Sequence, residues 1–199
     1  MTWSGFISYL ICIVGGFFLG GIMFSQIIPQ LTANKDIAAI SDDHNPGATN
    51  VFVNCGPKLG LICLSLDIAK GFVPAFLACN LLSTDHMLFG LALAAPVLGH
   101  AIAPLYHFHG GKCIATAFGV MLGMFPTNHA GLIILAGLYI FFSTVCKIQP
   151  NRIRSIVTFG LFGLISGALM IHQGLYSMAL GCVLIALTAM IKHSSYFCR

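Results

Sequence analysis

Long stretches without a charged residue are the feature that most restricts how this chain of 199 residues can fold. No Asp, Glu, Lys or Arg occurs between Met1 and Asn34, and a second uncharged run extends from Cys113 to Cys146. Only 7% of all residues are charged, whereas a soluble domain has about 25%. A water-soluble globular protein is therefore excluded, and an integral membrane protein is predicted.

The uncharged runs predict the number of membrane-spanning helices, because each crossing needs about 20 helical residues. Two runs are too long for one crossing, and each contains a turn signal, Phe125 to His129 in one and His172 to Gly174 in the other. The predicted spans are Trp3 to Ile28, Leu59 to Leu82, His86 to Tyr106, two within Cys113 to Cys146, of which the first is short, and two within Ser155 to Ile191. The predicted fold class is an all-α transmembrane bundle of seven helices, forming a single domain over residues 1–199.

The basic residues all fall on one side of this topology, apart from Lys70 inside the second span. With seven crossings, the linkers 29–58, 107–112 and 147–154 and the C-terminal tail share one side of the membrane. They contain Lys35, Lys58, Lys112, Lys147, Arg152, Arg154, Lys192 and Arg199. Short cytoplasmic loops are enriched in Lys and Arg. We therefore predict a multi-pass membrane protein, with its N-terminus outside and its C-terminus in the cytoplasm.

The composition also limits the classes of partner. Nine Lys and Arg spread over the chain cannot form a nucleic-acid patch, so no nucleic-acid partner is expected. The eight Cys include no Cys-x-x-Cys pair and are interpreted as reduced packing residues. No cofactor and no metal are predicted, with a divalent cation at Asp42 and Asp43 as the alternative. The chain is expected to act as a monomer.

Polar residues are concentrated on the predicted cytoplasmic side, which favours a pocket open to that side over a transport path reached from both faces. Within the second span, Asp67 and Lys70 are spaced i,i+3 and can pair on one helical face. Charged residues inside a membrane usually mark a functional site. The alternative is a purely structural ion pair at the membrane boundary.

The sequence Gly110-Gly111-Lys112, followed by an apolar helical run, is typical of an anion-binding turn. Glycine amides can approach a ligand closely, the start of a helix has unpaired N–H donors, and Lys112 adds a full charge. These features predict a phosphate site, although a simple turn at the membrane edge would have the same pattern. The turn Asn45 to Asn50 offers amides and a hydroxyl for a polar headgroup, or is an ordinary Asx turn.

Three motifs follow one another along nearly the whole chain. They are Phe24-Ser25-Gln26 with Asn45-Pro46-Gly47-Ala48-Thr49-Asn50, Gly56-Pro57-Lys58 with Asp67-Ile68-Ala69-Lys70-Gly71, and Gly99-His100 with Phe108-His109-Gly110-Gly111-Lys112. In their order and spacing they resemble the bacterial integral-membrane glycerol-3-phosphate acyltransferases that use acyl phosphate as the donor. The resemblance implies a location in the bacterial inner membrane.

The resemblance implies transfer of a fatty acyl group from acyl phosphate to the 1-hydroxyl of glycerol 3-phosphate, which gives lysophosphatidic acid at the membrane. No covalent nucleophile is required, and the sequence contains no Gly-x-Ser-x-Gly motif. The predicted catalytic residues are Lys112, Ser155 and His193. The predicted substrate-binding residues are Asn45, Gly47, Thr49, Asn50, Asp67, Lys70, His100, Gly110 and Gly111.

The chain departs from the family pattern at two positions where an arginine is expected, which are Ala38 and Val53 here. The loop before Asn45 is one residue longer and contains Asp42 and Asp43. Both changes reduce the positive charge available to a phosphate dianion. They keep open a sibling enzyme with another acceptor or a weakened lipid-binding homologue, and a small transporter is the third alternative.

Overall fold

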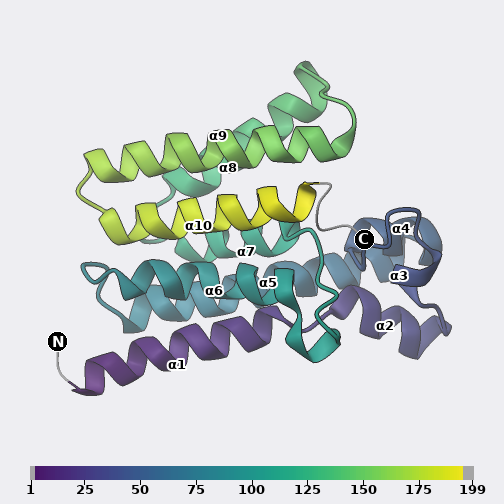
Figure 1. The fold of residues 1–199 in the computed structure, drawn as a ribbon, viewed down its shortest axis with the longest axis horizontal. Helices are drawn as coiled ribbons and strands as arrows, with labels where there is room; N and C mark the ends of the chain where they lie inside the picture. Colours follow the sequence, from purple (N-terminus) through teal and green to yellow (C-terminus); the bar gives the residue numbers. More distant parts are fainter. Residues whose placement is uncertain (1–2, 195–199) are drawn as a thin grey trace.

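The computed structural model describes residues 3–194, and all regular elements in this range are helical (Figure 1). The α-helices are α1 (Trp3–Gly20), α2 (Phe24–Ala33), α3 (Ile37–Ile40), α4 (Ala48–Cys55), α5 (Pro57–Leu81), α6 (Leu88–Ile102), α7 (Ile114–Met124), α8 (Ala130–Ile140), α9 (Asn151–His172) and α10 (Tyr176–His193). A 3-10 turn, Pro104–Tyr106, follows α6, and a π-helical turn, Phe141–Val145, extends α8.

Five of these helices are long and apolar enough to cross a membrane: α1, α5, α6 with its 3-10 turn, α9 and α10. α7 and the extended α8 are apolar but shorter. α7 has 11 residues and corresponds to the short helix expected after Cys113. The structure therefore confirms an all-helical, multi-pass architecture, while seven full crossings stay a prediction.

The prediction of one continuous helix over Trp3 to Ile28 is wrong. α1 ends at Gly20, the chain leaves helical geometry, and α2 begins at Phe24 in a separate direction (Figure 1). In a continuous helix, the carbonyl oxygen of Ile22 would accept a hydrogen bond from a backbone N–H of the same helix. Here it accepts a hydrogen bond of 2.5 Å from Lys70 Nζ on α5. A tertiary contact therefore stabilises the break.

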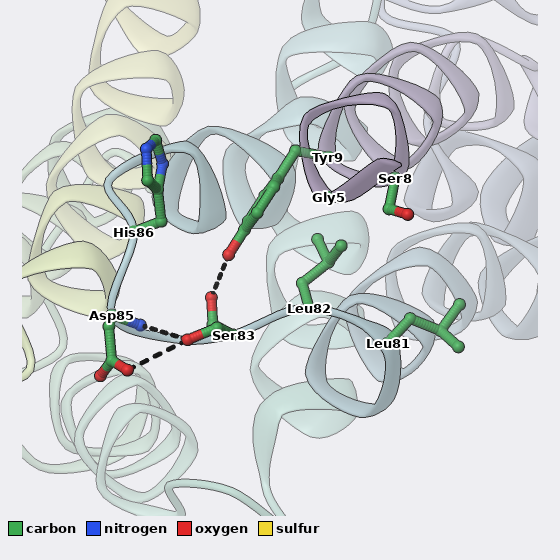
Figure 2. Close-up of a pocket in the computed structure, with 8 residues that line it drawn as sticks. All are labelled: Gly5, Ser8, Tyr9, Leu81, Leu82, Ser83, Asp85 and His86. Atoms are coloured by element: carbon green, nitrogen blue, oxygen red, sulfur yellow. Dashed lines mark hydrogen bonds between the residues drawn. The ribbon is translucent and has the colours of Figure 1, made fainter. Parts of the chain in front are cut away.

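The short turns α5–α6, α7–α8 and α9–α10 lie at one end of the bundle, here called the turn end. Tyr9 Oη donates a hydrogen bond of 2.5 Å to the Ser83 carbonyl, and Ser83 also bonds Asp85 (Figure 2). The Ser177 hydroxyl donates to the Thr84 carbonyl. The structure places a cavity of about 440 Å³ beside Tyr9 at this end. The described turns here contain no Lys or Arg.

The opposite end of the bundle, here called the basic end, contains α2 to α4 and the loops before α7 and α9 (Figure 1). Lys35, Lys58, Lys112 and Lys147 all lie there. The charge segregation expected from the sequence is thus present in the fold, and Arg199 lies outside the described residues. Which end faces the cytoplasm remains a prediction.

Close backbone approach holds the helices together, as in many membrane bundles. A Cβ added at Gly119 on α7 would lie 2.0 Å from the Ile68 carbonyl oxygen on α5. A Cβ added at Gly20 on α1 would lie 2.0 Å from the Pro96 carbonyl oxygen on α6. Both positions therefore require glycine for packing. α6 lies between α1 and α10 and buries Phe89, Leu93 and Val97 completely.

Gly20→Ala is expected to destabilise the protein, because the added methyl group forces α1 and α6 apart. Overpacking of this kind costs about 1–3 kcal/mol, which lowers the Tm of a protein of this size by roughly 2–4 °C per kcal/mol. Gly15→Ala is the matched control on the same helix, since a Cβ there meets nothing within 4 Å. Thermal unfolding in detergent measures both, and equal Tm values would contradict the packing argument.

Candidate active site

A cavity of about 580 Å³ opens at the basic end, between α4, α5, α7, α9 and the end of α10. Most of the residues predicted from the sequence to bind substrate or catalyse the reaction line this one cavity. They are Asn45, Gly47, Thr49, Asn50, Asp67, His100, Lys112, Ser155 and His193. The fold thus brings together residues that are up to 148 positions apart in the sequence, from Asn45 to His193. Their individual roles stay predictions.

A buried ion pair forms the inner wall of the cavity. Asp67 lies 2.8 Å from Lys70 Nζ and accepts a hydrogen bond of 2.6 Å from the Ser25 hydroxyl. Both charged residues are 2% exposed. Asp67 lines the cavity, whereas Lys70 lies behind it and bonds the Ile22 carbonyl. The predicted pair therefore exists, and it connects the cavity wall to the α1–α2 break.

Lys112 is paired with a residue that the sequence did not connect to it. Its Nζ lies 2.5 Å from Asp43 Oδ2, and Asn50 Nδ2 donates to Asp43 Oδ1 over 2.8 Å. Burial raises the pKa of the Asp43 carboxyl, but the hydrogen bonds from Lys112 and Asn50 outweigh it and the net pKa is lowered. Asp43 is therefore ionised at neutral pH.

Gly110 and Gly111, which were predicted to bind phosphate, do not line the cavity. The Gly111 amide already donates a hydrogen bond of 3.1 Å to the His100 carbonyl. A Cβ at Gly111 would lie 2.4 Å from His100 Nε2, and a Cβ at Gly110 would lie 2.2 Å from the Ala101 carbonyl oxygen. The two glycines let the loop pass closely over the end of α6. This packing accounts for the choice of glycine at both positions. Lys112 is the residue of this turn that lines the cavity, and phosphate binding by the two glycine amides stays a prediction.

The start of α9 contributes polar side chains that were not among the predicted site residues. Asn151, Arg152 and Arg154 line the cavity together with the buried Ser155. Arg152 Nε donates to the His193 carbonyl over 2.7 Å, and Arg154 lies 5.6 Å from the centre of the Tyr139 ring. A signal was available, because Asn151 and Arg152 precede Ser155 by four and three residues and so share its helical face.

The cavity is cationic at its polar end and apolar along one wall. The lining contains three cations, Lys112, Arg152 and Arg154. Asp43 is paired with Lys112 and Asp67 with Lys70, so the net positive charge comes from the arginines of α9. The apolar wall comes from α5 and α7 and consists of Leu64, Ile68, Ile114 and Phe118. Such a cavity can hold an anionic group and an adjoining hydrocarbon chain at the same time.

Comparison with known proteins shows the family of this chain. The family model described as "Glycerol-3-phosphate acyltransferase" matches residues 10–199. The chain belongs to the glycerol-3-phosphate acyltransferase family. The relative from Lacticaseibacillus casei, which has the family name, is 30% identical over 191 residues, or 96% of this chain and 87% of that protein.

Other members of the family match over shorter segments. The glycerol-3-phosphate acyltransferases of Maridesulfovibrio salexigens and Thermotoga petrophila are 38% and 41% identical to this chain. These alignments cover 60% and 57% of the relatives' own lengths. Two crystal structures of the integral membrane family member PlsY, a glycerol 3-phosphate form and a lysophosphatidic acid form, superpose with TM-scores of 0.74 and 0.73. Each is 26% identical, over 94% of this chain and 88% of that protein.

The family resemblance predicts arginine at two positions, which are Ala38 and Val53 here. Neither residue lines the cavity. Val53 on α4 is 78% exposed, and Ala38 lies on α3, where its amide donates to Gln26 Oε1. The positive charge of the cavity is supplied by Lys112 and by Arg152 and Arg154 of α9. The loss of the two arginines therefore leaves a cationic site in this family member.

Proposed function

We propose that this protein transfers a fatty acyl group from acyl phosphate to the 1-hydroxyl of glycerol 3-phosphate and releases lysophosphatidic acid and inorganic phosphate. The observation that carries the proposal is the two-sided cavity, with Lys112, Arg152 and Arg154 at its polar end and Phe118 in its apolar wall. Membership of the acyltransferase family supports it. The two PlsY structures, described as glycerol 3-phosphate and lysophosphatidic acid forms, support the acceptor and the product.

The chemistry needs positioning and charge stabilisation more than a reactive side chain. The acceptor hydroxyl oxygen attacks the acyl carbonyl carbon, a new ester bond forms, and the bond from that carbon to the phosphate oxygen breaks. Holding both substrates in attack geometry removes most of the entropic barrier. Lys112 and the α9 arginines stabilise the negative charge on the departing phosphate. The hydroxyl proton passes to His193 or to a phosphate oxygen, and Ser155 orients the acceptor.

The orientation in the membrane follows from the charge distribution of the fold. The basic end contains all the described Lys and Arg of the loops, whereas the turn end contains none. We infer that the basic end, with its cavity, faces the cytoplasm of a bacterial cell and that the turn end faces outward. Water-soluble glycerol 3-phosphate then enters from the cytoplasm, while the acyl chain stays in the inner leaflet.

Purified protein in detergent is expected to release inorganic phosphate from palmitoyl phosphate only when glycerol 3-phosphate is present. Phosphate release and lysophosphatidic acid formation should be equal in amount, because each acyl transfer frees one phosphate. Glycerol in place of glycerol 3-phosphate serves as the control for simple hydrolysis and for an uncharged acceptor. A well-folded protein that shows no acceptor-dependent phosphate release would refute the proposed reaction.

A further inference from the structure

The loop between α3 and α4 places a carboxylate where the proposed reaction requires a phosphate. Asp43 of this loop contacts Lys112 Nζ at 2.5 Å and Asn50 Nδ2 at 2.8 Å. The backbone N–H of Asn45 also donates a hydrogen bond to Asp43 Oδ1, over 3.3 Å. One carboxylate thus takes hydrogen bonds from three residues of the predicted substrate site.

Carboxylate and phosphate oxygens compete for the same donors, because both are anionic acceptors that prefer charge-assisted hydrogen bonds. A phosphate group that binds Lys112 and Asn50 must therefore replace Asp43. The Asp43 side chain is 44% exposed, and that of Lys112 is 26% exposed. Exposed ion pairs are weak, so a substrate dianion can displace this one. By contrast, the Asp67–Lys70 pair is fully enclosed and stays in place.

We propose that Asp43 is a specificity-determining residue that acts as an internal competitor for the substrate phosphate at Lys112 and Asn50. The inference rests on the proposed acyl transfer and deepens it. It explains how an acidic residue in this loop alters the site: an acceptor or donor phosphate takes the hydrogen bonds of Lys112 and Asn50 only after the Asp43 carboxylate is displaced. The site therefore prefers a dianionic substrate over an uncharged one less strongly than it would without Asp43. Because the lowered pKa keeps Asp43 ionised, protonation does not release it at neutral pH.

The neighbouring residue Asp42 offers a matched control. Asp43→Asn and Asp42→Asn remove the same charge from adjacent positions of one loop, but the Lys112 contact belongs to Asp43. For Asp43→Asn we expect KM for the phosphate substrate to fall about two- to fivefold, the range that a weak, partly exposed ion pair allows. For Asp42→Asn we expect a change of less than about twofold, because salt screens exposed charges. The kcat should change little in either variant.

Two substrates contain the competing phosphate chemistry, and the kinetics separate them. Glycerol 3-phosphate is varied at saturating palmitoyl phosphate, and then palmitoyl phosphate is varied at saturating glycerol 3-phosphate. The substrate whose KM falls in Asp43→Asn is the one that binds Lys112. An unchanged or higher KM for both substrates, relative to Asp42→Asn, would overturn the inference while leaving the acyl transfer itself intact.

A binding measurement tests the competition by Asp43 independently of the proposed acyl transfer. Calorimetric titration of wild-type, Asp43→Asn and Asp42→Asn protein with glycerol 3-phosphate and with inorganic phosphate requires no turnover. Tighter binding in Asp43→Asn alone supports the competition even if the wild-type protein fails to transfer an acyl group. Equal affinities in all three proteins refute it. Asp43→Ser provides a second variant with the same expected direction, so that the result does not depend on the asparagine amide.

Discussion

Replacement of Lys112 by alanine is expected to lower kcat/KM for acyl transfer by about 10²–10³-fold, the loss typical of removing one group that stabilises transition-state charge. The Lys112 ammonium is the cation of the Gly110-Gly111-Lys112 turn and lines the cavity. Its side chain is 26% exposed and contacts Asp43, so its removal should leave the fold intact. Initial rates of phosphate release from palmitoyl phosphate, measured at several glycerol 3-phosphate concentrations, give kcat and KM separately.

Lys58→Ala is the appropriate control for Lys112→Ala, because it removes a lysine from the same basic end that is exposed and does not line the cavity. It should keep nearly the full wild-type rate. A loss of activity in Lys112→Ala no larger than in Lys58→Ala would show that general positive charge, and not a specific phosphate contact, explains the basic end. The Tm of both variants should match the wild-type value.

The length of the helices could be read from the sequence, because the thickness of the bilayer sets it. The second span was predicted at Leu59 to Leu82 and is observed as α5, Pro57–Leu81. The first span was predicted two turns too long. Its end depends on Lys70, which binds the Ile22 carbonyl from 48 positions away in the chain. A local run of apolar residues contains no information about such a contact.

The site was predictable to the extent that its residues form recognisable motifs. Lys112 and the Asn45 to Asn50 turn were found in this way, and they line one cavity. Arg152 and Arg154 were missed because cytoplasmic loop charge already explained their presence. The hydrogen bond of the Gly111 amide was not foreseen, because its acceptor, the His100 carbonyl, lies at the end of another helix. Sequence patterns indicate which polar groups are available, whereas the residues with which these groups form hydrogen bonds or ion pairs depend on the tertiary fold.

Lys70→Met should cause the largest loss of stability among the substitutions considered. Lys70 Nζ contacts Asp67 at 2.8 Å and the Ile22 carbonyl oxygen at 2.5 Å, in surroundings where both side chains are almost completely buried. Methionine fills a similar volume but leaves the Asp67 carboxylate without its counter-charge. Breaking a buried pair from one side costs about 3–5 kcal/mol, so the Tm in detergent should fall by roughly 6–20 °C.

The double variant Asp67→Asn with Lys70→Met separates charge from packing. It removes both charges, and replacing a whole buried pair is often close to neutral, so it should recover most of the Tm lost in Lys70→Met. The Ile22 carbonyl loses its lysine donor in both variants. Any deficit in Tm that remains in the double variant therefore measures the contribution of the hydrogen bond from Lys70 to the Ile22 carbonyl. Lys58→Met, an exposed change on the same helix, should leave the Tm unaltered. A double variant no more stable than Lys70→Met would show that Lys70 stabilises the protein mainly through the Ile22 carbonyl and not through Asp67.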